Sequence, residues 1–179
     1  MKSIVLTILL LLLSVTVNAQ PESLQDILNK YAKAEDAAVV VMVTTPQGST
    51  LAAAGMADDT RAATGDDRFR IASISKTFVA VTTLLLVEEG VFELDDRAAE
   101  WLPQPVLENI ANADQVTIRQ LLSMRSGIED YLARESFFEA IEADPTFTWM
   151  PLDVLAYVYD LEPLAEPDTT FAYSNTNYV

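Results

Sequence analysis

A serine and a lysine lie three positions apart, Ser73 and Lys76, where a long apolar segment begins. The eleven residues that follow the lysine, Thr77 to Val87, carry no charge. Because residues i and i+3 are neighbours on one helical face, the lysine amine can reach the serine hydroxyl. A helix N-terminus and partial burial both favour a neutral lysine, which can accept the proton of a serine nucleophile. The spacing therefore predicts a nucleophilic serine with a lysine as its base.

A second group of polar residues, Tyr173-Ser174-Asn175, lies about a hundred positions further along the chain. A phenol beside a lysine can share its proton, and a carboxamide can hydrogen-bond both the amine and a substrate carbonyl. Each residue also has a structural interpretation. Ser73 would then be a helix N-cap, Lys76 would extend into water, and Tyr173 and Asn175 would be a half-buried aromatic and a turn residue. The presence of both groups in one chain favours the chemical interpretation.

The composition excludes many other catalytic centres. The chain contains no histidine and no cysteine, which excludes the usual zinc sites, iron–sulfur clusters, disulfides, thiol catalysis and a Ser-His-Asp relay. The acidic stretches lack the spacing of an EF-hand, so we expect no metal and no cofactor. A formal net charge of −16 disfavours nucleic acids and anionic membranes as partners. Nucleophilic chemistry must therefore use serine or threonine, with lysine, tyrosine or a carboxylate as the base.

The N-terminus has the pattern of an export signal. Lys2 provides a positive charge, Ile4 to Val17 is an apolar run, and Val17-Asn18-Ala19 is an acceptable cleavage site. The alternative is an uncleaved membrane anchor, but the run is shorter than the roughly 20 residues that span a bilayer. We therefore expect a signal peptide over residues 1–19 and an exported protein, periplasmic or secreted, with no membrane span after cleavage.

Hydrophobic periodicity and turn residues predict the elements that position these groups. The helix that starts near Ser73 is apolar on all sides, so we expect it to be buried in the middle of the protein. The predicted elements are a helix over 21–33, strands over 37–45 and 50–57 with a turn at 46–49, a helix over 73–89 capped by Gly90, a short helix after the Asp95-Asp96 pair, a helix over 116–127 ended by Gly127, a helix over 151–161 that starts with Pro151, and a proline-punctuated loop after it.

These motifs resemble the serine β-lactamase and D-Ala-D-Ala-peptidase superfamily, in its class C β-lactamase and esterase-like branch. Ser73-x-x-Lys76 and Tyr173-x-Asn175 match its first two motifs, and "GVFELDDRAAEWLP" and "VTIRQLLSMRSGI" resemble two further stretches. The resemblance covers about residues 25–179. It implies an α+β, β-lactamase/transpeptidase-like fold, with one catalytic domain over 20–179 that has an α/β portion at about 20–70 and a helical portion at about 71–179.

The resemblance also implies roles for four residues. Ser73 would be the acylated nucleophile and Lys76 its general base, while Tyr173 would assist proton transfer and Asn175 would position Lys76 and the substrate amide. The reaction would be acyl-enzyme hydrolysis of a β-lactam, a D-Ala-D-Ala peptide or a small ester or amide. The alternative is a non-catalytic sensor or scaffold that binds peptidoglycan or β-lactams.

The sequence departs from the family pattern in three places. Met124-Arg125-Ser126-Gly127 replaces His-Thr-Ser-Gly, and Pro167-Asp168 replaces Pro-Gly. Aspartate tolerates a left-handed turn less well than glycine, so the replacement leaves the geometry of the loop before Tyr173 open. The third motif of the family is absent up to Val179. We therefore expect the N-terminal part of a truncated fold, without its C-terminal strands, that is poorly stable and inactive by itself.

Overall fold

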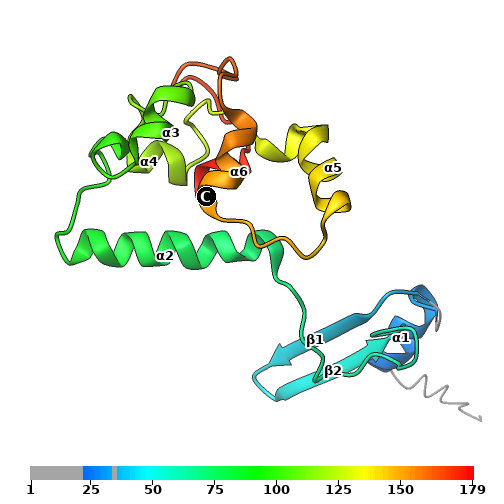
Figure 1. The fold of residues 1–179 in the computed structure, drawn as a ribbon. Helices are drawn as coiled ribbons and strands as arrows, with labels where there is room; N and C mark the ends of the chain where they lie inside the picture. The colour runs from blue at the N-terminus through cyan, green and yellow to red at the C-terminus, as the bar shows by residue number, and fades with distance from the viewer. Residues whose placement is uncertain (1–21, 34–35) are drawn as a thin grey trace, which may run out of the picture. The chain divides into compact units, whose positions relative to one another are not determined.

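The structure is a computed structural model that describes residues 22–33 and 36–179. The predicted signal peptide, residues 1–19, lies outside the described residues. The chain divides into two compact units, residues 1–70 and residues 71–179, and each is described by itself. Strands are confined to the first unit and all helices after α1 to the second (Figure 1), in agreement with the predicted α+β class.

The first unit consists of a helix and a hairpin. Helix α1 (Leu24–Tyr31) begins with a capping box, in which Ser23 accepts from the backbone of Asp26 and Asp26 accepts from that of Ser23. Strands β1 (Val39–Thr45) and β2 (Gly48–Ala54) are antiparallel, with Val39 opposite Ala54 and Thr45 opposite Gly48. Gly48 has a φ of 135°, which permits the tight turn that joins them. The predicted helix and hairpin are therefore confirmed.

Helix α1 also provides hydrogen-bond partners for backbone groups at one edge of this hairpin. The side chain of Gln25 donates to the backbone carbonyl of Ala53 over 3.0 Å and accepts from the Ala53 N–H over 3.3 Å. A carboxamide can replace a neighbouring strand in this way because it offers one donor and one acceptor. Ala52, beside it in β2, is buried.

The second unit begins with the predicted apolar helix. A 3-10 turn, η1 (Ala72–Ile74), leads into α2 (Ser75–Glu88). Gly90 has a φ of 72°, and the backbone N–H groups of Gly90 and Val91 donate to the carbonyls of Val87 and Leu86. This glycine ends the helix as predicted, because a left-handed residue lets the chain turn back on the last helical carbonyls.

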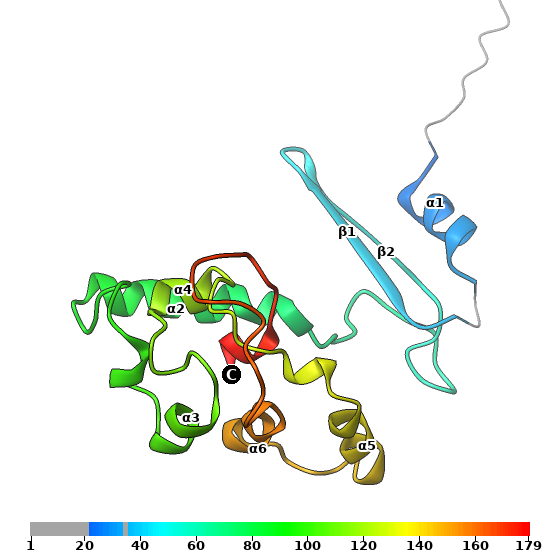
Figure 2. The ribbon, with the colours of Figure 1, turned by 90° about the horizontal axis from the view of Figure 1, so that it is seen from above.

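The remaining elements are short helices and 3-10 turns that surround a small core. They are η2 (Ala98–Glu100), α3 (Gln104–Asn109), α4 (Ile118–Leu122), η3 (Tyr131–Ala133), α5 (Glu135–Ala143), α6 (Pro151–Leu155), η4 (Ala156–Val158) and η5 (Asn175–Tyr178). Figures 1 and 2 show α3, α4 and α6 gathered on one side of α2, with α5 beyond α6. The core consists of Ala98, Val106, Ile110, Ala113, Val116, Ile128, Leu155 and Val158.

Two predicted helices differ from the observed ones, and two observed helices were not predicted. The helix expected over 116–127 is confined to α4, because Met124 already adopts a left-handed conformation with a φ of 58°. Gly127 has another role: its φ is 70°, and a Cβ there would collide with the carbonyl group of Ala165. The helix at Pro151 starts as predicted but continues only as the 3-10 turn η4. Helices α3 and α5 are additional elements.

The predicted burial of the apolar helix was wrong for the structure of this chain. No residue of α2 is buried, and Phe78 is 64% exposed. Apolar residues are distributed all around α2, so its burial would require packing partners on every side. Within residues 71–179 the other helices lie on one side of it (Figure 1). Hydrophobicity all round a helix thus predicts a need for cover, but it does not say which segment supplies the cover.

The described residues offer neither a membrane span nor an acidic metal site. No helix among residues 22–33 and 36–179 combines the length and the hydropathy needed to cross a bilayer. The same residues contain no group of three or more acidic side chains arranged to hold a metal ion.

Two valine-to-alanine substitutions test this division between core and surface. Val116 is 0% exposed, so Val116→Ala should lower the free energy of unfolding by about 2 kcal/mol. Val81 in α2 is 51% exposed, so Val81→Ala should change it by less than about 0.5 kcal/mol. Urea unfolding followed by circular dichroism measures both values. A loss at Val81 as large as that at Val116 would contradict the exposure of α2.

Candidate active site

Ser73 lies in the 3-10 turn η1, directly before α2. The N-cap position of α2 is Ile74, which has no side-chain cap, so Ser73 is not the capping residue of this helix. The preceding residue, Ala72, has a φ of 44°, a conformation that costs energy for any residue with a Cβ. The strained turn leaves the Ser73 hydroxyl free to face other side chains, and such strain is characteristic of functional sites.

The structure brings all four predicted site residues together. Lys76 Nζ donates to Ser73 Oγ over 3.2 Å and to Asn175 Oδ1 over 2.7 Å. Ser73 Oγ and Tyr173 Oη are 2.9 Å apart and share a hydrogen bond. Two groups of residues separated by about a hundred positions thus form one continuous network.

The side chain of Lys76 is held among aromatic rings as well as polar atoms. Its Nζ lies 5.2 Å from the ring centroid of Tyr173 and 5.8 Å from that of Tyr178. Lys76 is half-buried, and its amine is directed to Ser73 and Asn175 by the hydrogen bonds described above. The interpretation in which Lys76 simply extends into water does not describe this arrangement.

Buried neighbours fix the direction of Tyr173 and Asn175. The hydroxyls of Ser174 and Thr176 both donate to the backbone carbonyl of Glu129, over 3.1 and 2.6 Å. Ser174 and Thr176 are buried, whereas Tyr173 is 48% exposed. The alternate residues of this segment therefore anchor it, and the residues between them face the site.

Asp130 is a further site residue that the sequence did not reveal. Its Oδ2 accepts a hydrogen bond of 2.9 Å from Asn175 Nδ2. Because a carboxylate only accepts, it keeps the nitrogen of the carboxamide on its own side and turns Oδ1 toward Lys76. Asp130 and Asn175 are 45 positions apart, and no local pattern marks the aspartate. Its position three residues after Gly127 is the one signal that links it to the motif-like stretch.

The two departures from the family pattern contact one another. Arg125 Nε donates to Asp168 Oδ1, and Arg125 Nη2 donates to the Asp168 carbonyl, both over 2.6 Å. The Asp168 N–H donates to the Arg125 carbonyl over 2.8 Å. Asp168 adopts a φ of 64°, so the left-handed turn expected of glycine is kept by an aspartate. The sequence left the loop geometry open at this residue, and the structure shows a left-handed turn there.

Met124, which replaces the histidine of the family pattern, also supports the loop before Tyr173. Its carbonyl accepts from the Ala172 N–H over 3.0 Å, and its sulfur accepts from Asn177 Nδ2 over 3.3 Å. The Ser126 hydroxyl donates to Asn177 Oδ1 over 2.6 Å. The Met124–Gly127 stretch therefore acts as a scaffold for the second motif.

The network shifts the acidity of Tyr173. Its hydrogen bond with Ser73, and then that with Lys76, holds the pKa of the Tyr173 phenol below its ordinary value of 10.0. Burial has the opposite effect on Tyr131 and Tyr178, whose pKa values are raised. A phenol with a lowered pKa beside a serine hydroxyl gives up its proton more readily than a free tyrosine and can return it.

A hydroxyl within hydrogen-bonding reach of a base, with the base oriented by a third group, is the geometry of an activated nucleophile. Ser73, Lys76 and Asn175 meet that description. An arrangement of this kind suits acyl transfer by side chains.

Comparison with known proteins gives the family. The model of the family described as "Beta-lactamase" matches residues 24–179. The chain belongs to the beta-lactamase family. Penicillin-binding protein 4* of Bacillus subtilis (strain 168) is 32% identical to this family member over 111 residues, which are 62% of this chain and 23% of that protein.

Solved structures support the same assignment. The D-stereospecific amidohydrolase from Streptomyces sp. is 35% identical with a TM-score of 0.66, over 79% of this chain and 41% of that one. The D-amino acid amidase from Ochrobactrum anthropi SV3 is 29% identical with a TM-score of 0.64, over 87% of this chain and 43% of that one. This beta-lactamase family member therefore covers part of the family fold, and it spans about a quarter to two-fifths of the length of these relatives.

The lowered pKa of Tyr173 predicts its titration behaviour. Among the six tyrosines of the chain, Tyr173 should ionise first as the pH rises, because its phenolate accepts from Ser73 and lies beside Lys76. Ser73→Ala should move this ionisation back toward the ordinary value. The absorbance of phenolate at 295 nm measures both, and Tyr173→Phe identifies the early phase. An early phase that persists in Tyr173→Phe would contradict the assignment.

The contact between Arg125 and Asp168 predicts a rescue. Arg125→Thr should lower the free energy of unfolding by about 1 kcal/mol, since it leaves Asp168 strained without its partner and the exposed pair is screened by solvent. Adding Asp168→Gly should restore most of that loss, because glycine adopts a positive φ freely. Urea unfolding midpoints of the single and double variants test this.

Arg119 and Asp95 provide the matched control, since they form a similar exposed ion pair in which Asp95 has no positive φ. There Asp95→Gly should not rescue Arg119→Thr. If Asp168→Gly deepens the loss caused by Arg125→Thr, the ion pair does not serve the left-handed turn.

Proposed function

We propose that this chain carries the catalytic centre of a serine hydrolase that works through an acyl-enzyme on Ser73. The observation that supports it most directly is the set of hydrogen bonds that joins Ser73 Oγ to both Lys76 Nζ and Tyr173 Oη. Membership of the beta-lactamase family supports the same conclusion. The family match extends over both groups of site residues.

The proposed reaction has two halves. Ser73 Oγ attacks the substrate carbonyl carbon while its proton passes to Lys76 or to the Tyr173 phenolate, and the backbone N–H of Ser73 forms part of the oxyanion site. The carbonyl–leaving group bond then breaks, and Tyr173 returns the proton to the leaving group. In the second half the same groups take a proton from water, which attacks the ester and releases the acid and free Ser73.

Asn175 and Asp130 support this chemistry by holding Lys76 in place. Asn175 Oδ1 holds Lys76 Nζ within reach of Ser73, and Asp130 holds the carboxamide in that orientation. When substrate binds, the carboxamide of Asn175 is placed to contact the substrate amide. A lysine that is positioned rather than mobile loses less entropy in the transition state.

The proposed substrates carry an amide, ester or β-lactam carbonyl. The solved structures similar to this chain include a D-stereospecific amidohydrolase and a D-amino acid amidase, and its relatives include a penicillin-binding protein. We therefore propose substrates of the amino acid or peptide type, such as D-amino acid amides, D-Ala-D-Ala peptides and β-lactams.

With the signal peptide expected at residues 1–19, we propose that the reaction takes place outside the cytoplasm, in the periplasm or the medium.

We also propose that the 179-residue chain turns substrate over slowly by itself. Tyr173 is 48% exposed, and no residue of α2 is buried. Water competes for the hydrogen bonds of an open site and weakens its electrostatic stabilisation of a transition state.

Labelling with a fluorescent penicillin tests the nucleophile. Ser73→Ala should abolish the covalent adduct, and Lys76→Met should slow its formation by roughly 10²–10⁴-fold because the base is lost. Ser75→Ala is the matched control, since Ser75 lies two residues away, is exposed and has no place in the network. Intact-mass spectrometry of the chain measures the adduct and its release.

The outcomes separate the candidate functions. An adduct that forms on Ser73 and then decays, however slowly, supports the hydrolase, whereas an adduct that never decays supports a sensor that captures its ligand without turnover. Labelling that survives in Ser73→Ala but is lost in Ser75→Ala would overturn the assignment of the nucleophile.

A further inference from the structure

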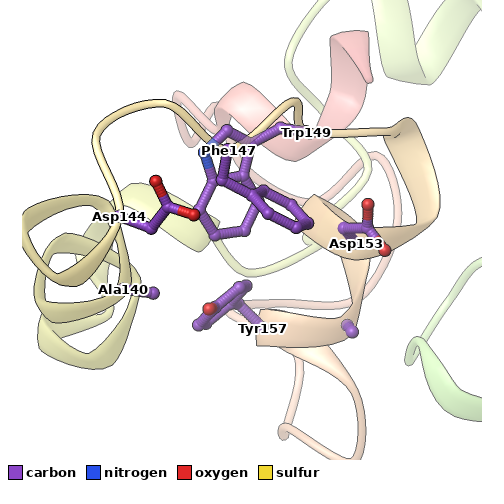
Figure 3. Close-up of a pocket in the computed structure, with 7 residues that line it drawn as sticks. Ala140, Asp144, Phe147, Trp149, Asp153 and Tyr157 are labelled. Atoms are coloured by element: carbon purple, nitrogen blue, oxygen red, sulfur yellow. The ribbon is translucent and has the colours of Figure 1, made fainter.

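A cavity of about 430 Å³ lies between α5 and α6 and takes no part in the network around Ser73. Its walls are aromatic. Phe147 and Trp149 come from the loop between the two helices, and Tyr157 comes from η4. Figure 3 shows the rings of Phe147 and Trp149 facing Tyr157, with the carboxylates of Asp144 and Asp153 on opposite sides of them.

The aromatic walls are held in place from behind. The buried ring of Phe137 lies 5.1 Å from Trp149 and 5.2 Å from Tyr157, measured between ring centroids. Phe147 and Trp149 meet edge to face at 4.9 Å. Such contacts favour defined ring orientations, so the cavity presents π-faces in a fixed arrangement.

The charged side chains that line the cavity are all negative. Asp144 and Asp153 are the charged residues that line it, and within the described part of the chain neither forms an ion pair. Asp144 Oδ1 accepts from Thr146, and Asp153 Oδ2 accepts from the Met150 N–H over 3.0 Å. The turn around Asp144 holds its carboxyl in the charged form, because the hydrogen bonds from Thr146 lower its pKa. In each carboxylate the second oxygen is left for a ligand.

We propose that this cavity binds a small organic cation with a quaternary ammonium group. Aromatic faces attract such a cation through their quadrupoles, and its methyl groups bury apolar surface against the same rings. Two carboxylates beside the rings add charge complementarity that a neutral ligand cannot use. A bare divalent metal ion does not fit, since aromatic walls cannot replace its oxygen ligands.

Choline and its neutral isostere 3,3-dimethylbutan-1-ol are the probes. The full chain with Trp101→Phe leaves Trp149 as the fluorophore, because the chain has two tryptophans. At constant ionic strength choline should change the Trp149 emission with half-saturation at about 1–10 mM. The neutral alcohol should bind at least several-fold more weakly, and Mg²⁺ should not compete with choline.

Three variants localise the binding. Asp144→Asn with Asp153→Asn keeps the acceptors for Thr146 and Met150 but removes both charges, and it should raise the half-saturation concentration about five- to tenfold. Phe147→Leu keeps apolar volume without a π-face and should raise it roughly threefold for choline alone. The matched control, Glu108→Gln with Asp114→Asn, removes two charges from a different groove and should leave the concentration unchanged.

Each of three results would overturn the proposal. These are a choline titration that does not saturate, equal binding of the neutral alcohol, and an equal loss in the control pair, which would indicate a general charge effect. Circular dichroism of every variant shows that the fold is retained, so that a loss of binding is assigned to the cavity.

Discussion

The amino group of Lys76 and the hydroxyl of Ser73 are joined to Tyr173 and Asn175 by hydrogen bonds, and the arrangement of residues 71–179 around the site depends on these bonds. A half-buried amine must be given acceptors, and here Asn175 and Ser73 provide them. The second motif can supply these groups only if its segment is held in place. That function falls to the backbone carbonyl of Glu129, which accepts from the hydroxyls of both Ser174 and Thr176. Its neighbour Asp130 then orients Asn175. The site is thus built on contacts between residues 129–130 and 174–176.

Local signals were sufficient for one half of this site. The three-residue spacing of Ser73 and Lys76 places both side chains on one helical face whatever the rest of the chain does. Gly90 ends α2 by its own conformational freedom, and the Ser23–Asp26 capping box begins α1 in the same local way. The second half, Tyr173 and Asn175, was singled out by side-chain chemistry and by the resemblance, because no local pattern predicts that a segment a hundred positions away reaches Lys76. Asp130 was missed because its role exists only once Asn175 is brought beside it.

Two predictions that rested on local sequence failed because tertiary contacts decide the outcome. The helix predicted to extend to Gly127 ends at Leu122, since Met124 adopts the left-handed conformation and directs its carbonyl to Ala172. Gly127 is needed instead where the backbone of Ala165 passes too close for a Cβ. The apolar helix α2 was expected to be buried, yet composition states only that burial would be favourable. Whether it is buried depends on which segments lie against it, and residues 71–179 cover one side.

Asp168 shows how a left-handed turn can be formed where the glycine of the family pattern is replaced. What the loop before Tyr173 requires is a residue with a positive φ, and glycine is one way to supply it. Asp168 supplies it at a conformational cost, and the guanidinium of Arg125 offsets that cost by binding both its carboxylate and its carbonyl. The arginine stands where the pattern has threonine, so the residues that replace threonine and glycine contact one another. Ala72, directly before Ser73, likewise adopts a φ of 44° without being glycine. In both places a residue with a Cβ adopts a positive φ, so the fold keeps a left-handed conformation at a conformational cost.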